Sequence, residues 1–268
     1  MELVKNGTIK SIRAKALGIN RKNIYRESIL EAKDLLIKEE INQTHKKHPA
    51  YGHRRLGWHL HINPKKIRRI MRKYAIKVPR RKRRNNFCTV SVKHRLYPNL
   101  IKDLPITYEN QLWCSDTSRF IFHNQKWYIV TILDIFTRQV IGVSIGRHHD
   151  SDLVLKAIQM AIVTTHTVPT IFHSDQGTEF MAEECADLLE KLGTKISASD
   201  KASPWQNGYQ ESFFGKFKDD VGDINRFETP GELLEELYHG IHYYNNERIH
   251  TALKMPPAVY AKQFLKKS

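Results

Sequence analysis

The sequence predicts an α/β protein: a mixed five-stranded sheet flanked by helices, with an all-α, basic region in front of it. Two observations support this prediction. From about Leu112, short apolar runs alternate with stretches of helical periodicity, and nearly all of the excess positive charge lies before that point. The 268 residues are enough for about two domains with a sizeable core. No apolar run approaches the roughly 18 residues of a membrane span.

Positive charge is concentrated in one segment of the chain. Residues 41–102 contain 19 Lys and Arg and no Asp or Glu. The rest of the chain contains the other 25 of the 44 basic residues and all 28 acidic residues. The net charge of +16 is therefore a property of this segment, which is typical of a polyanion-binding region. We predict a helical DNA-binding region over residues 1–100, in which residues 77–100 form an arm or linker.

The first forty residues predict helices. Residues 8–28 have the form of two short helices around a turn at Gly18, which fits either a DNA-reading helix-turn-helix or a plain helix pair. An amphipathic helix follows, and its apolar side chains are expected to pack inward or against a second chain: Ile29, Leu30, Leu36, Ile37 and Ile41. The N-terminus MELVKNGTIK lacks the apolar segment of a secretory signal, which favours a cytoplasmic protein.

A sharper DNA-binding candidate lies between residues 51 and 84. One helix is expected in YGHRRLGWHLHI, and a second begins after Asn63, a favourable cap followed by Pro64. Ile67 and Ile70 belong to a buried stripe on this second helix, so its basic residues are left to face a major groove. The predicted DNA contacts on the two helices are Arg54, Arg55, Lys65, Lys66, Arg68, Arg69, Arg72 and Lys73.

A run of five basic residues follows: Arg80, Arg81, Lys82, Arg83 and Arg84. It has no apolar face, so we expect an extended arm on phosphates or in a minor groove; a solvated linker is the alternative.

Histidines between residues 45 and 61 suggest a zinc site, but the nearest cysteine is Cys88 and the ligand spacing fails. The cysteines are odd in number and far apart, as expected for reduced thiols: Cys88, Cys114 and Cys185.

Residues 101–225 are predicted to form the α/β domain, followed by a helical extension over residues 226–268. Strands at 112–122, 127–136 and 139–145 are joined by short turns and should form an antiparallel meander. The remaining elements are, in order, a helix capped near Asp150, the strand before Asp175, a helix at about 181–192, a strand at 195–197 and a helix that begins at Ser203 and Pro204.

Three carboxylates are candidate metal ligands. Asp116 lies inside a strand, where Asp is disfavoured and costly to bury unpaired. Asp175, in HSDQGTEF, follows an apolar run and should sit where a strand gives way to a turn. Glu211 lies on the last core helix, opposite an aromatic stripe. That stripe contains Trp205, Tyr209, Phe213 and Phe217. Three other aspartates are alternatives to Asp116 as the first of the three metal ligands: Asp134, Asp150 and Asp152.

These residues carry a family resemblance. Asp116, then HSDQG with Asp175, then NG before ES at Glu211 after 35 intervening residues, resemble the DDE core shared by retroviral-type integrases and insertion-sequence transposases. The flanks YGHRRLGWHL and YYNNERIHTALKMPPAVY are similar to the second-frame transposase of the insertion-sequence-three family, so the resemblance covers roughly residues 45–262. The stretch SASDKASPWQNGYQES departs from the commonest family motif, a serine- and glycine-rich loop that ends in an Asp-Asn pair.

The resemblance implies a ribonuclease-H-like fold, in which the first and fourth strands are neighbours, behind a helix-turn-helix. It also implies DNA cleavage and strand transfer that depend on two Mg²⁺ ions, with Mn²⁺ as a substitute. Asp116 would bridge the ions, Asp175 would bind one and Glu211 the other. The residues expected to support these ligands or to contact DNA are His173, Ser174, Gly177, Asn207 and Lys218.

The implied partners are double-stranded DNA at the element ends and at the target, further copies of the chain in a synaptic complex, and the product of an upstream reading frame. Action at the bacterial nucleoid would follow. Two alternatives stay open: a DNA-binding regulator that keeps the fold without the reaction, and a nuclease that cuts without joining.

Overall fold

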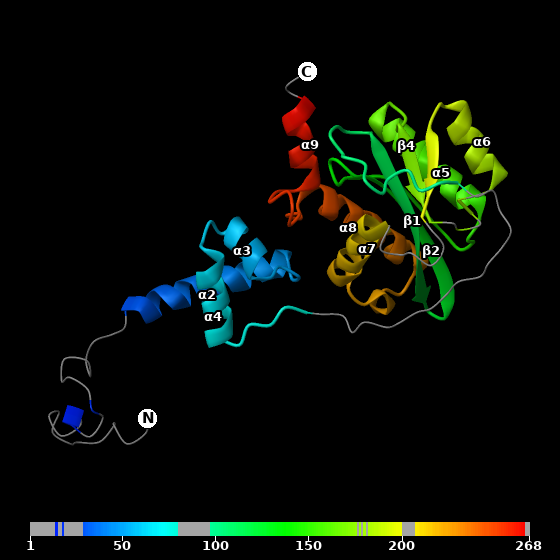
Figure 1. Cartoon of the computed structure of the whole chain (residues 1–268). Helices are drawn as coiled ribbons and strands as arrows, with labels where there is room; N and C mark the ends of the chain where they lie inside the picture. The colour runs from blue at the N-terminus through cyan, green and yellow to red at the C-terminus, as the bar shows by residue number, and fades with distance from the viewer. Residues whose placement is uncertain are drawn as a thin grey trace. The chain divides into compact units, whose positions relative to one another are not determined.

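The computed structural model describes residues 29–79, 97–175, 177, 179–180, 182–199 and 207–265, together with Ala14, Lys15 and Gly18. The chain divides into two compact units between Val78 and Pro79 (Figure 1). Apart from Ala14, Lys15 and Gly18, the predicted helix pair at residues 8–28 lies outside the described residues, as does the basic run Arg80–Arg84.

Three helices form the first unit: α2 (Ile29–Lys47), α3 (His53–His59) and α4 (Pro64–Lys73). Asn63 caps α4, because its side chain accepts a hydrogen bond of 2.9 Å from the backbone N–H of Lys65. The close approach of α3 to the start of α4 depends on Gly57, where a Cβ would lie 2.7 Å from Cγ of Pro64. The core of the unit contains Ile37, Ile41, Leu56, Ile67 and Ile70.

The inward packing predicted for α2 is wrong for two of its residues. Leu30 and Leu36 are exposed, whereas Ile37 and Ile41 are buried as predicted. The reason is the register of the helix, which turns Asp34 toward α4 and so gives an inward position to a charged residue. The alternative, packing of the apolar side chains against a second chain, stays a prediction.

The second unit is built on a five-stranded mixed sheet in the order β3-β2-β1-β4-β5. The strands are β1 (Leu112–Phe122), β2 (Gln125–Asp134), β3 (Val140–Gly146), β4 (Ile171–Ser174) and β5 (Lys195–Ala198). The first three are antiparallel, as predicted, while β4 pairs parallel with both β1 and β5. This order is that of the ribonuclease-H-like fold, and it confirms the predicted fold class.

Helices cover both faces of the sheet. On one face, α5 (Ser151–Thr165) and α6 (Glu183–Lys191) pack on a core that includes Trp113, Val130 and Phe172. On the other, α7 (Gly208–Val221) and α8 (Pro230–Asn246) cover a second core, and α9 (Pro257–Leu265) packs on α8 (Figure 1). None of the described helices is long and apolar enough to cross a membrane.

Helix α8 is held tightly against α7. Gly240 allows this contact, because a Cβ there would lie 2.9 Å from the Phe217 ring. Beyond the end of α8, the guanidinium of Arg248 forms an ion pair with Asp220 near the end of α7, and both side chains are buried. The apolar stripe of α8 is buried: Leu233, Leu237, Ile241 and Tyr244.

Candidate active site and candidate nucleic-acid surface

Two of the three predicted carboxylates lie just beyond the parallel pairing of β1 with β4: Asp116 inside β1, and Asp175 directly after the end of β4. Cys114 of β1 is in register with His173 of β4, and Asp116 and Asp175 each follow two residues later. Backbone N–H groups orient both side chains: Thr117 donates to Oδ1 of Asp116 at 2.8 Å, and Gly177 donates to Oδ1 of Asp175 at 3.1 Å. The sheet topology therefore brings two carboxylates from distant parts of the chain together.

Burial and nearby negative charge oppose the ionisation of both carboxylates. Loss of hydration raises the pKa of Asp116 to about 7, and the nearby charge of Asp175 adds to this rise. Loss of hydration also raises the pKa of Asp175, and the charge of Glu179 contributes. A divalent cation between such groups would offset their repulsion, and carboxylate oxygens are the ligands that Mg²⁺ prefers.

This pKa shift predicts an unusual pH dependence of stability. Because Asp116 has a pKa of about 7 in the fold against an ordinary 3.8, the folded protein binds more protons than the unfolded chain between these values. Its contribution to stability is therefore fully present below about pH 4 and lost as the pH rises toward about 7. Asp116→Asn should raise the melting temperature in EDTA at about pH 8 and change it little at about pH 4. An equal shift at both pH values would contradict this interpretation.

The first turn of α7 is fastened to the strand that carries Asp116. The side chain of Gln210 is buried and donates to the carbonyl oxygens of Cys114 and Thr131, while its Oε1 accepts from the Thr131 hydroxyl at 3.1 Å. Asn207 donates to the carbonyl oxygen of Ser115 at 3.1 Å. Glu211, the residue after Gln210, is therefore held close to this segment of β1.

Glu211 itself does not complete the site in this arrangement. Its side chain is exposed, and within the described residues it makes no hydrogen bond or ion pair with Asp116 or Asp175. No three His, Cys, Asp or Glu side chains of the described residues lie close enough together to hold one metal ion. The helix that carries Glu211 is described from Gly208, so the predicted start at Ser203 and Pro204 lies outside the described residues.

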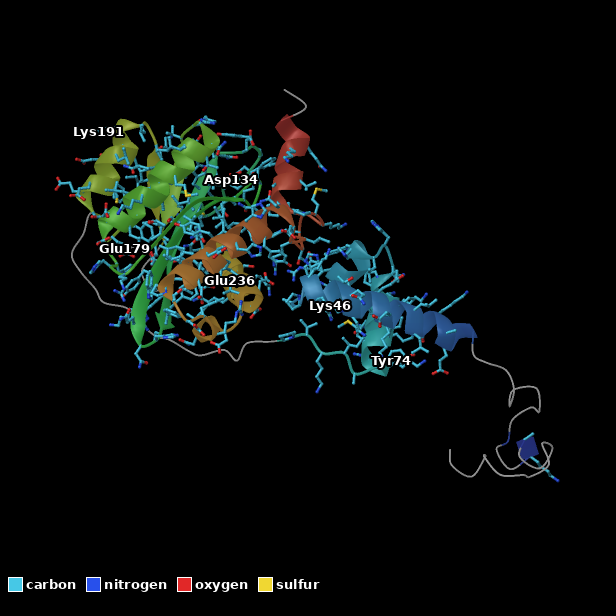
Figure 2. The ribbon with its side chains drawn as sticks, turned by 180° about the vertical axis from the view of Figure 1, so that it is seen from behind. Lys46, Tyr74, Asp134, Glu179, Lys191 and Glu236 are labelled. Atoms are coloured by element: carbon cyan, nitrogen blue, oxygen red, sulfur yellow. The ribbon has the colours of Figure 1, made fainter. Side chains whose placement is uncertain are left out.

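The rival aspartates have other partners. Asp134, at the end of β2 (Figure 2), accepts hydrogen bonds from the hydroxyl of Thr137 at 2.6 Å and from three backbone N–H groups. Asp150 caps α5 by accepting from the N–H of Leu153 at 3.1 Å. Asp152 forms an exposed ion pair with Lys156. Each therefore stabilises a turn or a helix.

The residues beside the site that were predicted to support the metal ligands or to contact DNA also have partners within the fold. His173 is fully buried, burial lowers its pKa to about 4, and its two ring nitrogens lie 2.9 and 3.0 Å from the hydroxyls of Ser197 and Ser199. It joins β4 to the end of β5 and does not present a surface to DNA. Asn207 is likewise buried. Lys218 stands over the Phe120 ring, 5.1 Å from its centre, and its charge lowers the pKa of Asp116.

The sequence interpretation overlooked one acidic residue near the site. Glu179 lies in the turn between β4 and α6 (Figure 2), is buried, and forms an ion pair of 2.6 Å with His149. Its place in HSDQGTEF was the available signal, but its partner is 30 residues away in the sequence.

Tyr209 also differs from the prediction: it is exposed under the guanidinium of Arg138, while Phe214 is buried in its place.

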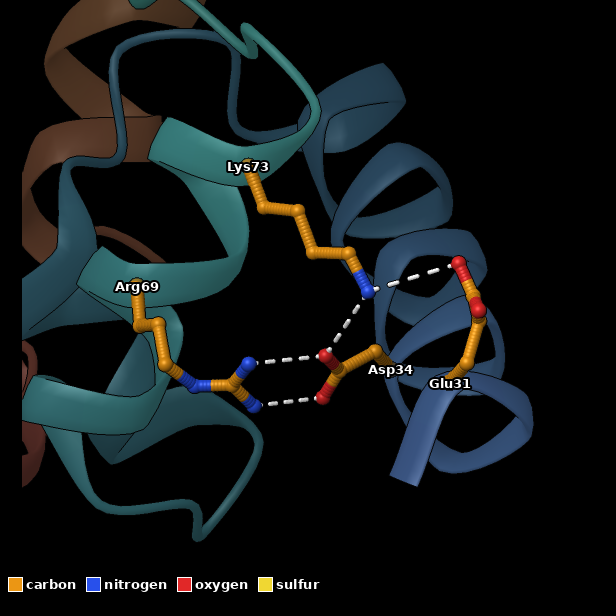
Figure 3. Close-up of polar contacts among 4 residues, drawn as sticks. All are labelled: Glu31, Asp34, Arg69 and Lys73. Carbon is orange, nitrogen blue, oxygen red and sulfur yellow. Dashed lines mark hydrogen bonds and ion pairs between the residues drawn. The ribbon is translucent and has the colours of Figure 1, made fainter. Parts of the chain in front are cut away.

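In the first unit, two residues that were predicted to contact DNA, Arg69 and Lys73, form ion pairs with acidic residues. Asp34 of α2 is fully buried and accepts two hydrogen bonds from Arg69, at 2.8 and 2.5 Å. Nζ of Lys73 lies 3.4 Å from Asp34 and 3.6 Å from Glu31 (Figure 3). The hydrogen bond from Arg69 lowers the pKa of Asp34, so the pair stays charged and holds α4 on α2.

The neighbouring face of α4 is different. Arg68 and Arg72 are exposed and, together with Arg54 of α3, surround His53, whose pKa is lowered first by burial and then by these three charges. Within the described residues none of the three arginines forms an ion pair. Lys65 lies one turn before Arg68 on the same face. The exposed face of α3 and α4 is therefore an uncompensated cationic surface.

Comparisons with known proteins agree with this geometry. Two integrase core domain models match residues 107–204 and 192–257. An uncharacterized transposase-like protein of Haemophilus influenzae is 30% identical over 205 residues, which cover 76% of this chain and 95% of the relative. The transposase for insertion sequence element IS904 of Lactococcus lactis is 30% identical over 159 residues, 58% of this chain and 63% of that protein.

A solved structure of the catalytic core domain of HTLV-2 integrase in complex with magnesium covers 57% of this chain and 96% of that domain, with a TM-score of 0.47 and 18% identity. The sequence relatives and the matching integrase core models, together with the strand order and the paired aspartates, establish the assignment. The chain belongs to the insertion-sequence transposases that carry an integrase core domain.

Proposed function

We propose that the protein cleaves DNA at the ends of an insertion sequence and joins those ends to target DNA, using Asp116, Asp175 and Glu211. The observation that carries this proposal is the closeness of Asp116, inside β1, to Asp175, directly after the adjacent parallel strand β4. The anchoring of α7 beside Asp116 supports the place of Glu211 as the third ligand. The insertion-sequence-three family is the proposed subgroup.

The residues of the site fit divalent cations. Two hard oxygen ligands lie together in a setting where their negative charges repel, which is the donor set that Mg²⁺ or Mn²⁺ takes. Asp116, Asp175 and Glu211 would hold such ions, which would supply Lewis acidity toward the nucleophile and the leaving oxygen of a phosphodiester.

The proposed domain layout assigns DNA recognition to residues 1–100, chemistry to 101–225 and a packing role to 226–268. The cationic face of α3 and α4 supports the first assignment. Two element ends must be held together, so we propose a homo-oligomer that acts on chromosomal DNA in the nucleoid. Co-expression with the upstream reading frame, followed by co-purification, tests the other expected partner.

The decisive experiment incubates the purified full-length protein with labelled DNA that carries the ends of its own element. With Mg²⁺, new 3′-hydroxyl ends and joined products should appear, and neither should appear in EDTA. A pre-cut end separates the rival activities: joining of that end identifies a strand transferase, whereas cleavage without joining identifies a nuclease. Binding without any cleavage would leave only a DNA-binding regulator.

The two faces of α4 should respond differently to mutation. The double change of Arg68 and Arg72 to Gln should reduce the slope of log affinity against log salt concentration by about 0.9 for every DNA phosphate that the variant no longer neutralises. The control Lys33→Gln, which removes one exposed charge from α2, should leave the slope unchanged. Arg69→Gln should instead lower the melting temperature, because it leaves the buried Asp34 poorly paired.

Titration of binding by fluorescence anisotropy at several salt concentrations measures these slopes. If Arg69→Gln reduced the slope as much as the double variant, the division of α4 into a DNA face and a structural face would be wrong.

A further inference from the structure

A pair of side chains outside the predicted triad adjoins the two aspartates. Nε2 of His149 lies 2.6 Å from Oε1 of Glu179, whose surface is only 6% exposed. The ring of His149 is stacked on that of Tyr128 in β2, with the ring centres 4.9 Å apart. His149 also directly precedes Asp150, the cap of α5, which fixes its backbone. The pair therefore links β2 and α5 to the turn that follows Asp175.

Glu179 and Asp175 are coupled through a single glycine. A Cβ at Gly177 would lie 2.8–2.9 Å from the carboxylate atoms of Glu179, so only glycine leaves room for this carboxylate. The N–H of the same glycine donates to Oδ1 of Asp175. From the other side, Sγ of Cys185 donates to the carbonyl oxygen of Glu179 at 3.5 Å. The carboxylate of Glu179 therefore lies beside the glycine whose N–H orients Asp175.

Glu179 is also the third negative charge of this region. Its charge contributes to the raised pKa of Asp116 and of Asp175. The hydrogen bond with Glu179 in turn raises the pKa of His149, which favours the cationic ring. While the two are paired, they add no net charge beside the aspartates. Without the cation, Glu179 would add a full negative charge and a competing carboxylate.

We propose that His149 is a positioning residue that holds Glu179 away from the metal ions, so that the intended carboxylates alone set the charge and geometry of the site. This inference rests on the proposed divalent-ion site at Asp116 and Asp175. Its physical basis is the demand of Mg²⁺ for near-ideal octahedral geometry, since an extra carboxylate would take a position needed by water or by the scissile phosphate. Partners of this kind around metal ligands typically change metal affinity or activity by about 10- to 100-fold when mutated.

Three variants of the full-length protein test the proposal: His149→Gln, Glu179→Gln and the double variant. Glutamine at 149 keeps a hydrogen-bond donor but removes the cation. His149→Gln should therefore bind Mn²⁺ roughly three- to tenfold more tightly, because Glu179 loses the charge that opposes it. Glu179→Gln should bind no more tightly than the wild type, and the double variant should return to the wild-type affinity. Isothermal titration calorimetry without DNA, at about pH 6.5, below the raised pKa of His149, gives these affinities.

The rate of DNA cleavage provides a second measurement, and it should change in the direction opposite to the Mn²⁺ affinity. At saturating Mg²⁺, His149→Gln should be slowed by about tenfold although it binds the ion more tightly, and the added Glu179→Gln change should restore most of the rate. Thermal melting of each variant establishes that it is folded. A merely structural pair would weaken Mn²⁺ binding and stability together in all three variants. That result, or unchanged Mn²⁺ affinity in His149→Gln, would overturn the proposal.

The variant Asp175→Asn distinguishes a failure of this inference from a failure of the proposed function. If Asp175→Asn binds Mn²⁺ as well as the wild type, the proposed ion site itself is wrong. If it loses Mn²⁺ binding while His149→Gln and the double variant fail to show the predicted gain and return, only the role of His149 is rejected.

Discussion

Asp116→Asn should reduce DNA cleavage and strand joining by at least about a thousandfold, because the loss of a metal ligand removes several kcal/mol of transition-state stabilisation. Asp175→Asn and Glu211→Gln should have effects of the same size. DNA binding should stay within a few-fold of the wild type, since the cationic face of α3 and α4 is unchanged. Gel assays with labelled element ends measure both quantities.

Asp152→Asn is the matched control for these changes. It removes the same charge from an exposed position in α5, where Asp152 pairs with Lys156, and should leave the rate within about twofold. Glu211→Gln is the most informative of the three site variants, because the proposed function requires the exposed side chain of Glu211 to join the two aspartates. Normal turnover in Glu211→Gln would remove that residue from the site.

Arg248→Met should lower the free energy of unfolding by about 3–5 kcal/mol, the cost of leaving a buried carboxylate without its partner. Arg248 is 2% exposed and its guanidinium pairs with Asp220, which is also buried. The loss should appear in urea unfolding as a lower midpoint with an unchanged slope. Because this pair joins the end of α8 to the helix that carries Glu211, the same variant should lose activity at lower temperatures than the wild type.

The chain offers a control for this pair as well. Arg226 and Glu236 form an ion pair of 3.0 Å, but both side chains are partly exposed, so Arg226→Met should cost no more than about 1 kcal/mol. Replacing Asp220 by Leu together with Arg248→Met should recover most of the stability, because no unpaired buried charge is left. Similar losses for the two arginine variants would show that burial does not set the strength of these pairs.

The strand order and the pairing of Asp116 with Asp175 could be predicted from the sequence. The apolar run before Asp175, the turn at Gly177 and the short connections of the meander are local signals, and the family resemblance supplied the neighbouring positions of the strands. The caps at Asn63 and Asp150 were also predicted correctly, because a helix cap depends on a few adjacent residues.

Contacts between distant segments could not be predicted in the same way. A helical wheel separates the faces of α4, but it does not reveal that Asp34, 35 residues earlier, binds Arg69. The pairing of Glu179 with His149 and the burial of Asn207 against Ser115 likewise depend on how elements pack. Local patterns therefore indicate the chemistry of the candidate site, while tertiary packing decides which polar residues remain available for ligands.

The side chain of Gln210 constrains how the active arrangement can be reached. Its amide spans carbonyl groups of two adjacent strands, β1 and β2, so sliding or rotating α7 as a rigid rod would break bonds to both at once. In the proposed site, the carboxylate of Glu211 would instead approach the aspartates by rotation about its own side-chain bonds, because Gln210 holds the adjacent backbone. Assembly of the site would then be a rotamer change and would not require the protein to repack its core.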